Sequence, residues 1–104
     1  MAEKVLKVGT TEQIPPGGVR IVLVAGKMVA VFNIDGTFHA IDNECPHQGG
    51  PIGEGSLKGA VVSCPWHWWQ YDVASGKCLS NPFAQLQSYP VRVAGDEVWV
   101  TIAS

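Results

Sequence analysis

Glycine and proline interrupt this chain so often that no long helix fits between them. The 104 residues include 12 Gly and 7 Pro, and the runs that remain are short and rich in Val, Ile and Phe. Proline ends helices and glycine weakens them, whereas short β-branched runs bounded by turn residues are typical of strands. The sequence therefore predicts an all-β protein, and its length predicts a single domain over residues 1–104.

The predicted strands are short and closely spaced. Turn-forming residues at Gly26-Lys27, Asp35-Gly36 and Ala94-Gly95-Asp96 predict antiparallel hairpins. The expected strands are residues 3–8, 19–25, 28–34, 37–42, 57–63 with a break at Gly59, 71–73, 86–93 and 97–102. Residues 71–79 are expected to form a small hairpin. We expect the two ends of the chain to build a β framework, with approximately residues 43–79 inserted in its middle.

Charged residues are sparse and nearly balanced, which argues against some classes of partner. They make up 15% of the chain, and the net charge is −2. A chain with this charge has no electrostatic attraction to nucleic acid or to an anionic membrane surface. We therefore expect neither nucleic acid nor a membrane as a partner.

The apolar runs are too short for a membrane segment. Residues 1–7 alternate between apolar and charged side chains, and the longest apolar stretch, residues 21–25, has the length of a strand. This pattern predicts no signal peptide or transmembrane anchor, and hence a cytoplasmic protein. The three cysteines cannot all pair with one another, which fits a compartment where thiols stay reduced.

Two short motifs each place a thiol close to an imidazole. They are Cys45-Pro46-His47 and Cys64-Pro65-Trp66-His67. Two Cys and two His can bind a structural zinc ion, but zinc fingers usually pair like ligands and separate them by two or more residues. Here each pair is mixed, and one residue separates Cys45 from His47. Mixed pairs favour an iron–sulfur cluster with one sulfur-bound iron and one nitrogen-bound iron; a zinc-stabilised interaction module remains the alternative.

The two motifs resemble a known pair of cluster-binding loops. Cys-Pro-His-Gln-Gly-Gly at 45–50 and Cys-Pro-Trp-His at 64–67 are similar to the loops of the Rieske family, and the resemblance covers essentially the whole chain. It implies one Rieske-type 2Fe–2S cluster. It also implies an antiparallel β-sandwich framework with a small cluster-binding subdomain of two loops inserted in it. By this resemblance, the metal ligands are expected to be Cys45 and Cys64 on the buried iron, and His47 and His67 on the outer iron.

This ligand set has a physical consequence for the reduction potential. An oxidised 2Fe–2S core carries a charge of about +2, so two thiolates bring the site to about zero, whereas four thiolates make it negative. An electron adds more readily to the neutral site. Gly49 and Gly50 would let backbone N–H groups approach the sulfurs, which further stabilises the reduced state.

Departures from the family pattern indicate which branch of the Rieske family the chain resembles. Respiratory Rieske proteins carry an extra Cys in each loop, and these two form a disulfide; Gly50 and Trp66 stand at the matching positions here. We therefore predict a soluble protein with a low potential, near the bottom of the ~−150 to +300 mV Rieske range. Tyr71 stands where the respiratory branch has a Tyr, so two roles stay open for it: donating a hydrogen bond to a ligand sulfur, or packing beside the loop.

Several other residues near the motifs have two interpretations. Trp66, Trp68 and Trp69 surround His67 in the sequence; one or two of them are expected in the core and the others at an apolar docking surface. Asn81-Pro82 matches the family's proline loop, which packs over the cluster. The alternative interpretation is an ordinary turn. Cys78 lies outside both motifs and is predicted to be a buried free thiol.

The resemblance implies an electron carrier rather than an enzyme. Soluble Rieske ferredoxins pass one electron from a reductase, often a flavoprotein, to a terminal oxygenase, and His47 and His67 would be the point of electron entry and exit. A self-contained oxygenase needs a further two-His-one-carboxylate iron site, for which only His39 is left. The alternative is a small Rieske subunit of a nitrite-reductase-like or other oxidoreductase complex.

Overall fold

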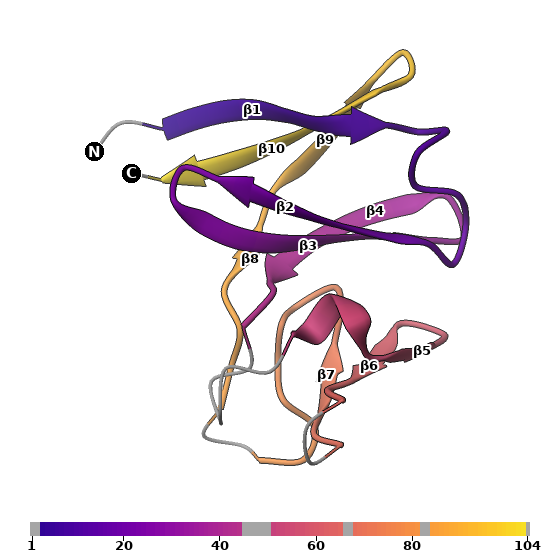
Figure 1. The fold of residues 1–104 in the computed structure, drawn as a ribbon, viewed down its shortest axis with the longest axis vertical. Helices are drawn as coiled ribbons and strands as arrows, with labels where there is room; N and C mark the ends of the chain where they lie inside the picture. The colour runs from indigo at the N-terminus through magenta and orange to yellow at the C-terminus, as the bar shows by residue number, and fades with distance from the viewer. Residues whose placement is uncertain (1–2, 45–50, 66–67, 82–83, 104) are drawn as a thin grey trace.

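The part of the chain that the structure describes folds into three antiparallel sheets and one short 3-10 helix (Figure 1). The computed structural model describes residues 3–44, 51–65, 68–81 and 84–103. Within these residues the elements are β1 (Glu3–Thr10), β2 (Val19–Val24), β3 (Lys27–Ile34), β4 (Thr37–Asp42), η1 (Ile52–Glu54), β5 (Ser56–Lys58), β6 (Val61–Ser63), β7 (Gln70–Asp72), β8 (Ser88–Tyr89), β9 (Val91–Ala94) and β10 (Glu97–Ala103). The all-β prediction is confirmed.

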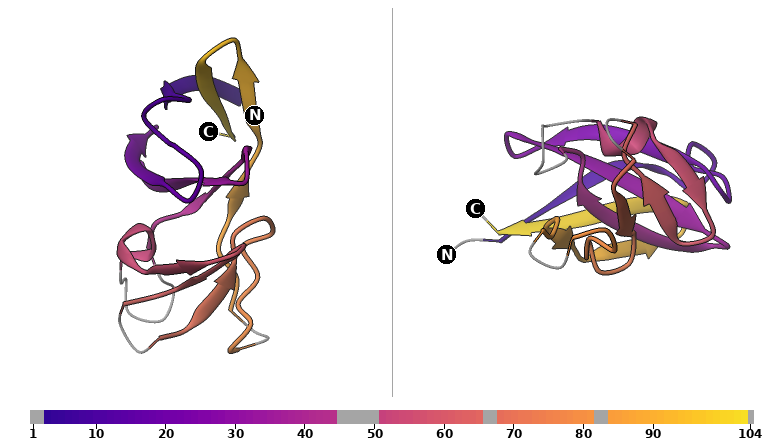
Figure 2. Two further views of the ribbon diagram at one scale, coloured as in Figure 1. Left: turned by 90° about the vertical axis from the view of Figure 1, so that its right-hand side faces the viewer. Right: turned by 90° about the horizontal axis from the view of Figure 1, so that it is seen from below.

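Two of the sheets pack face to face and form what we call the framework. Their strand orders are β1-β10-β9 and β2-β3-β4-β8, and Figure 2 shows the two layers from the side. The first and last strands of the chain are neighbours in one sheet, so the two ends of the chain build the framework together. The predicted antiparallel sandwich is confirmed.

The third sheet, β5-β6-β7, together with η1 forms what we call the site layer. It lies against the other face of the β2-β3-β4-β8 sheet, at the end of the molecule opposite β1 and β10 (Figure 1). The side chains of strand β3 show that this sheet is covered on both faces. Val29 and Val31 face the framework core, whereas Ala30 and Phe32 pack against site-layer residues. Since side chains alternate along a strand, the unbroken apolar run of β3 reflects a sheet covered on both faces.

The chain crosses between the framework and the site layer once in each direction. It leaves the framework after β4 and returns at β8. The crossing points are hydrogen-bonded to each other, because the Asp42 N–H donates to the Gln87 carbonyl (2.9 Å). The site layer is therefore an insertion between β4 and β8, and its two connections to the framework lie side by side.

The predicted strand 86–93 is wrong in one respect. It divides at Pro90 into β8, which pairs with β4, and β9, which pairs with β10. Proline has no N–H to donate to a strand ladder, so the chain changes sheets there. Leu86 lies outside both strands, and its N–H donates to the Gly76 carbonyl (2.8 Å).

One turn differs from the prediction, and one predicted break in a strand is confirmed. The β2–β3 turn consists of Ala25 and Gly26, both at positive φ (49° and 82°), and not of Gly26-Lys27. Two residues with positive φ match the twist of a tight hairpin. The predicted break at Gly59 is the turn of a hairpin between β5 and β6. No helix in the described ranges is both long and apolar enough to cross a membrane.

Candidate metal centre

Cys64 is the one predicted ligand that lies within the described residues; Cys45, His47 and His67 lie outside them. Cys64 directly follows β6, and its side chain is fully buried. Its N–H donates to the Trp69 carbonyl (2.7 Å), and its carbonyl accepts from the Trp68 N–H (3.1 Å). These two bonds fix Cys64 at the base of the β6–β7 connection, with its sulfur in the core of the site layer.

The two described tryptophans of this connection have opposite environments. Trp69 packs against the buried cluster that contains Cys64, whereas Trp68 is 66% exposed. Trp68 also has a φ of 60°, a left-handed conformation that costs a non-glycine residue about 1–2 kcal/mol. The prediction that one or two of the tryptophans belong to the core is confirmed for Trp69, and Trp66 lies outside the described residues.

The base of the first predicted loop is closed by Asn43, which the sequence reasoning missed. The Asn43 carbonyl accepts from the Ile52 N–H (2.7 Å), and its side-chain Oδ1 accepts from the Gly53 N–H (2.7 Å). Next to them, Glu44 and Pro51 form an isolated antiparallel bridge. Residues 43–44 and 51–53 are thereby held together on the two sides of the 45–50 segment.

The segment after η1 lies directly against the strand that leads to Cys64. A Cβ placed on Gly55 would stand 1.9 Å from the Ser63 carbonyl oxygen, so the two backbones approach more closely than any side chain permits. The structure therefore brings the flank of the first Cys/His motif next to the start of the second.

A third segment runs along β7. Tyr71 forms a bridge with Cys78, and the Leu79 N–H donates to the Gln70 carbonyl (2.7 Å). The Ser80 hydroxyl accepts from the Gln70 N–H (3.0 Å). The turn before Cys78 is therefore confirmed as a small hairpin onto β7, and Pro82 of the predicted proline loop lies outside the described residues.

Tyr71 and Cys78 belong to the same buried cluster as Cys64. The Tyr71 side chain is fully buried, so it packs beside the second motif; hydrogen bonding to a ligand sulfur stays a prediction. Cys78 is buried and forms no disulfide within the described part of the chain, as predicted.

Asp42 joins the two crossings between the framework and the site layer. Its carboxylate accepts from the Tyr89 hydroxyl and from the Gln87 N–H (3.1 Å). Burial of Tyr89, together with its hydrogen bond to Asp42 and the charge of that carboxylate, raises the pKa of the Tyr89 phenol above its usual value. The sequence carries no local indication of this contact, because it joins residues 47 positions apart.

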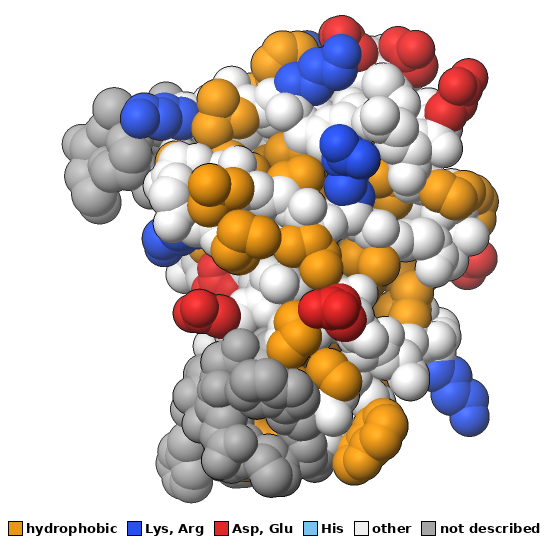
Figure 3. Space-filling model, in the orientation of Figure 1, with side chains coloured by type: hydrophobic (Ala, Val, Ile, Leu, Met, Phe, Trp, Pro, Cys, Tyr) orange, Lys and Arg blue, Asp and Glu red, His pale blue; other side chains and the backbone are white. Residues whose placement is uncertain are grey.

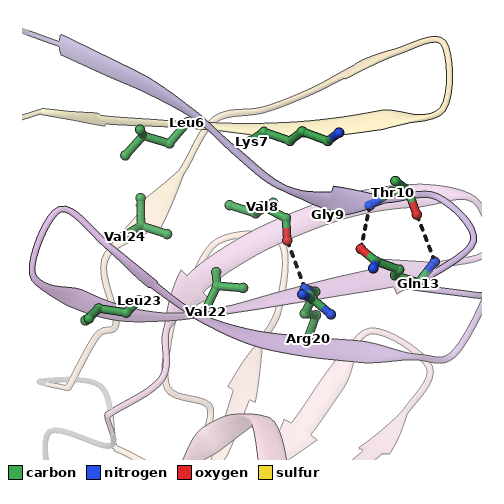
Figure 4. A pocket seen from close by; sticks show the side chains of 10 residues that line it. All are labelled: Leu6, Lys7, Val8, Gly9, Thr10, Gln13, Arg20, Val22, Leu23 and Val24. Carbon is green, nitrogen blue, oxygen red and sulfur yellow. Dashed lines mark hydrogen bonds between the residues drawn. The ribbon is translucent and has the colours of Figure 1, made fainter.

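A groove of the framework lies far from the two motifs. It has a volume of about 590 Å³ and separates the edge strands β1 and β2 (Figure 4). The Arg20 side chain spans it and donates through Nε to the Val8 carbonyl (3.0 Å). The groove is part of the framework and contains none of the predicted ligands.

Exposed apolar side chains occur at both ends of the molecule. Figure 3 shows hydrophobic side chains across the middle of one face, over β2 and β3, and more of them toward the lower end. The large exposed ones in the described residues are Val5, Val19, Leu23, Met28, Trp68, Leu79 and Val93. Of these, Trp68 and Leu79 belong to the site layer and its neighbouring segment.

The described surroundings of Cys64 fit an iron–sulfur cluster. A thiol that is fully buried among apolar side chains becomes a thiolate readily only when a cation compensates its charge. The predicted donor set of two Cys and two His would supply two thiolates and two imidazoles, the combination that Rieske centres use. Three of these four donors lie outside the described residues, and within those residues no three metal-binding side chains come together.

Comparison with known proteins points to one family. The model of the Rieske [2Fe-2S] domain matches residues 4–90. The naphthalene 1,2-dioxygenase system ferredoxin component of Pseudomonas aeruginosa is 34% identical, over 99% of this chain and 100% of that relative.

Two solved structures extend the comparison. A chain in the complex of reduced oxygenase and oxidized ferredoxin in carbazole 1,9a-dioxygenase superposes with a TM-score of 0.86 and 33% identity, over 92% of this chain and 91% of that one. A structure assigned to the NADH-dependent nitrite reductase small subunit of Mycobacterium tuberculosis has a TM-score of 0.88 and 25% identity, over 100% and 99% of the two chains. The predicted Rieske-type fold is confirmed.

Proposed function

The chain belongs to the Rieske [2Fe-2S] domain family, and from this premise we propose that it is an electron carrier between a reductase and a terminal oxygenase. It carries one 2Fe–2S cluster of the Rieske type, which supplies reversible one-electron transfer when bound. We propose a single domain over residues 1–104, with residues 43–79 as the approximate cluster-binding insert and without a catalytic site of its own.

The observation that carries this proposal is the end-to-end match with a ferredoxin component. The match covers 100% of that relative, so the chain accounts for the whole length of a protein whose name describes an electron carrier. The likeness to a chain from an oxygenase–ferredoxin complex supports an oxygenase as the electron acceptor.

The proposed ligands are Cys45 and Cys64 for one iron, and His47 and His67 for the other. The full burial of Cys64 supports its place on the inner side of the cluster. Thiolates in the core and imidazoles on the solvent side would give the electron a short path to a docked partner. We propose a potential below 0 mV, low in the ~−150 to +300 mV Rieske range.

Docking near the second motif would place the partner close to the cluster. Trp68 follows His67 directly and is 66% exposed, and Leu79 is 57% exposed. Large exposed apolar side chains often mark contact sites, and aromatic residues dominate the binding energy of interfaces. A carrier that meets two partners in turn needs a small contact of this kind.

The carrier function is tested by reconstitution with a terminal oxygenase and a reductase from the same source. The expected result is substrate oxidation that requires NAD(P)H, both partners and this protein. Oxidation at the same rate without this protein would contradict the proposal. A variant with Cys64→Ser should fail to support the reaction, because it cannot hold the cluster.

A second candidate is a subunit of a nitrite-reductase-like complex. The full-length likeness to a nitrite reductase small subunit favours it. Size-exclusion chromatography of the native protein from its source separates the two functions. A free carrier elutes near its mass of 11.1 kDa, whereas a permanent subunit elutes with a much larger catalytic chain.

We also propose that the carrier works in the cytoplasm, where thiols stay reduced. The three cysteines cannot all pair with one another, which supports a reducing compartment. Fractionation of source cells, with the cluster's absorbance as the marker, tests this location.

A further inference from the structure

One polar side chain is buried at the point where the chain enters the first ligand motif. Asn43 directly follows β4 and is 8% exposed. Buried polar groups need hydrogen-bond partners, and Asn43 is bonded on two sides. Its N–H donates to the Met28 carbonyl (2.9 Å), and its carbonyl and Oδ1 accept from the Ile52 and Gly53 N–H groups (both 2.7 Å). Asn43 therefore ties β3 to η1.

The helix η1 passes this restraint on to the strand that carries Cys64. A Cβ on Gly53 would stand 2.6 Å from Ile21 Cγ1 and 2.9 Å from Asn43 Oδ1, and a Cβ on Gly55 would stand 1.9 Å from the Ser63 carbonyl oxygen. Both glycines thus allow close backbone packing on either side of η1. A continuous series of contacts leads from Asn43, two residues before Cys45, to Ser63, one residue before Cys64.

We propose that Asn43 is a positioning residue for the cluster, which through its side-chain bond to Gly53 sets the spacing of the two ligand-bearing segments. The inference rests on the proposed function, because it concerns ligands of the same cluster. Asn43 itself is not a ligand. It acts on one side of the site through the entry to the first motif and on the other through η1 and β6.

The chain offers a matched control in Asn33. This side chain is also buried, and it makes two bonds to backbone groups where the Asn43 side chain makes the one to Gly53: its Nδ2 donates to the Ile14 carbonyl (2.8 Å), and its Oδ1 accepts from the Gly36 N–H (2.7 Å). These contacts lie within the framework and its connecting loops. Asn33→Ala therefore removes two buried side-chain bonds and Asn43→Ala removes the bond to Gly53, and only the second substitution lies on the path between the ligands.

The experiment compares cluster bleaching by an iron chelator and the electron paramagnetic resonance of the reduced proteins. Loss of residues that orient metal ligands typically weakens metal binding 10–100-fold, so we expect Asn43→Ala to bleach roughly 10–100-fold faster than wild type. Its resonance should also broaden. Asn33→Ala should lower the melting temperature but keep the wild-type spectrum and bleaching rate.

Two more variants separate positioning from general destabilisation. Asn43→Asp keeps an oxygen acceptor for the Gly53 N–H and should restore most of the slow bleaching. Gly53→Ala crowds the same bond and should resemble Asn43→Ala, and these two variants decide the question if Asn43→Ala does not fold. Equal bleaching of Asn43→Ala and Asn33→Ala, or no rescue by Asn43→Asp, would overturn the proposal. A wild-type protein without a 2Fe–2S resonance would instead overturn the proposed function.

Discussion

The framework and the site layer are stabilised by different means. In the framework, β1 and β3 each have eight residues and two sheets enclose a shared apolar core. In the site layer, β5, β6 and β7 have three residues each. Strands this short are not stable alone, so the site layer depends on the framework face beneath it, on bonds such as that of Asn43, and on its cluster. The comparison predicts that damage to the site and damage to the core have separable effects.

The largest effect is expected from removing a ligand. Cys64→Ser should abolish the visible absorbance of the cluster, because the hydroxyl is a poor substitute for the thiolate. Metal binding contributes to folding of the surrounding segment, so hydrogen exchange should become faster in the site layer while β3 and β10 stay protected. Cys78→Ser is the control and should keep the cluster. Equal loss of protection in both regions would show that they do not differ as we describe.

A deletion in the framework core should have the opposite pattern. Ile102 is fully buried in the cluster that joins the two framework sheets. Ile102→Ala is expected to lower the free energy of unfolding by about 2–5 kcal/mol, measured by urea denaturation. Below the denaturation range its electron paramagnetic resonance should match wild type, and an altered resonance would contradict the independence of the two regions.

The contact within the framework sheet, at the two points where the chain crosses to the site layer, should respond to pH. Tyr89→Phe removes a hydrogen bond to the Asp42 carboxylate and should cost about 1.5–3 kcal/mol at neutral pH. Folding raises the pKa of Tyr89, so the unfolded chain loses the phenol proton at a lower pH than the folded protein does. The contribution of Tyr89 to the free energy of unfolding therefore falls as the pH rises above the unfolded pKa of about 10. Urea denaturation at increasing pH should bring the stabilities of wild type and variant together; a constant gap would contradict this linkage.

The smallest effect on stability is expected at the exposed end of the site layer. Trp68→Gly removes the cost of a left-handed φ from a residue with little buried surface, so stability should change by about 1 kcal/mol or less, in the stabilising direction. Electron transfer to the partner, followed by stopped-flow absorbance, should slow. Trp68→Asn also tolerates this φ and should slow transfer equally; unchanged rates in both variants would exclude Trp68 from docking.

Local patterns allowed the framework to be predicted from the sequence. The Asp35-Gly36 turn and the runs around it specify the β3–β4 hairpin, whose register is set by neighbouring residues. The division at Pro90 was also encoded locally, since proline cannot continue a ladder, but the two sheets that β8 and β9 join are determined by distant strands. The bounds of β8 and β9 therefore required the structure.

The sequence offers candidate ligands for the site, but it does not indicate the residues that support them. The four proposed ligands stand out through a specific double motif, whereas Asn43 has no local pattern that separates it from other asparagines. Its bond to Gly53 depends on how β4, η1 and β6 pack together. The exposed, left-handed Trp68 is equally undetectable, because tryptophan favours neither property.

The most direct test of the central claim is a redox titration of the purified protein, followed by electron paramagnetic resonance and metal analysis. We predict two iron atoms per chain in one 2Fe–2S cluster, a one-electron midpoint below 0 mV, and a fall toward about −400 mV in His67→Cys. A colourless protein that contains zinc, a midpoint well above 0 mV, or an unchanged potential in His67→Cys would contradict a low-potential cluster with mixed Cys and His ligands.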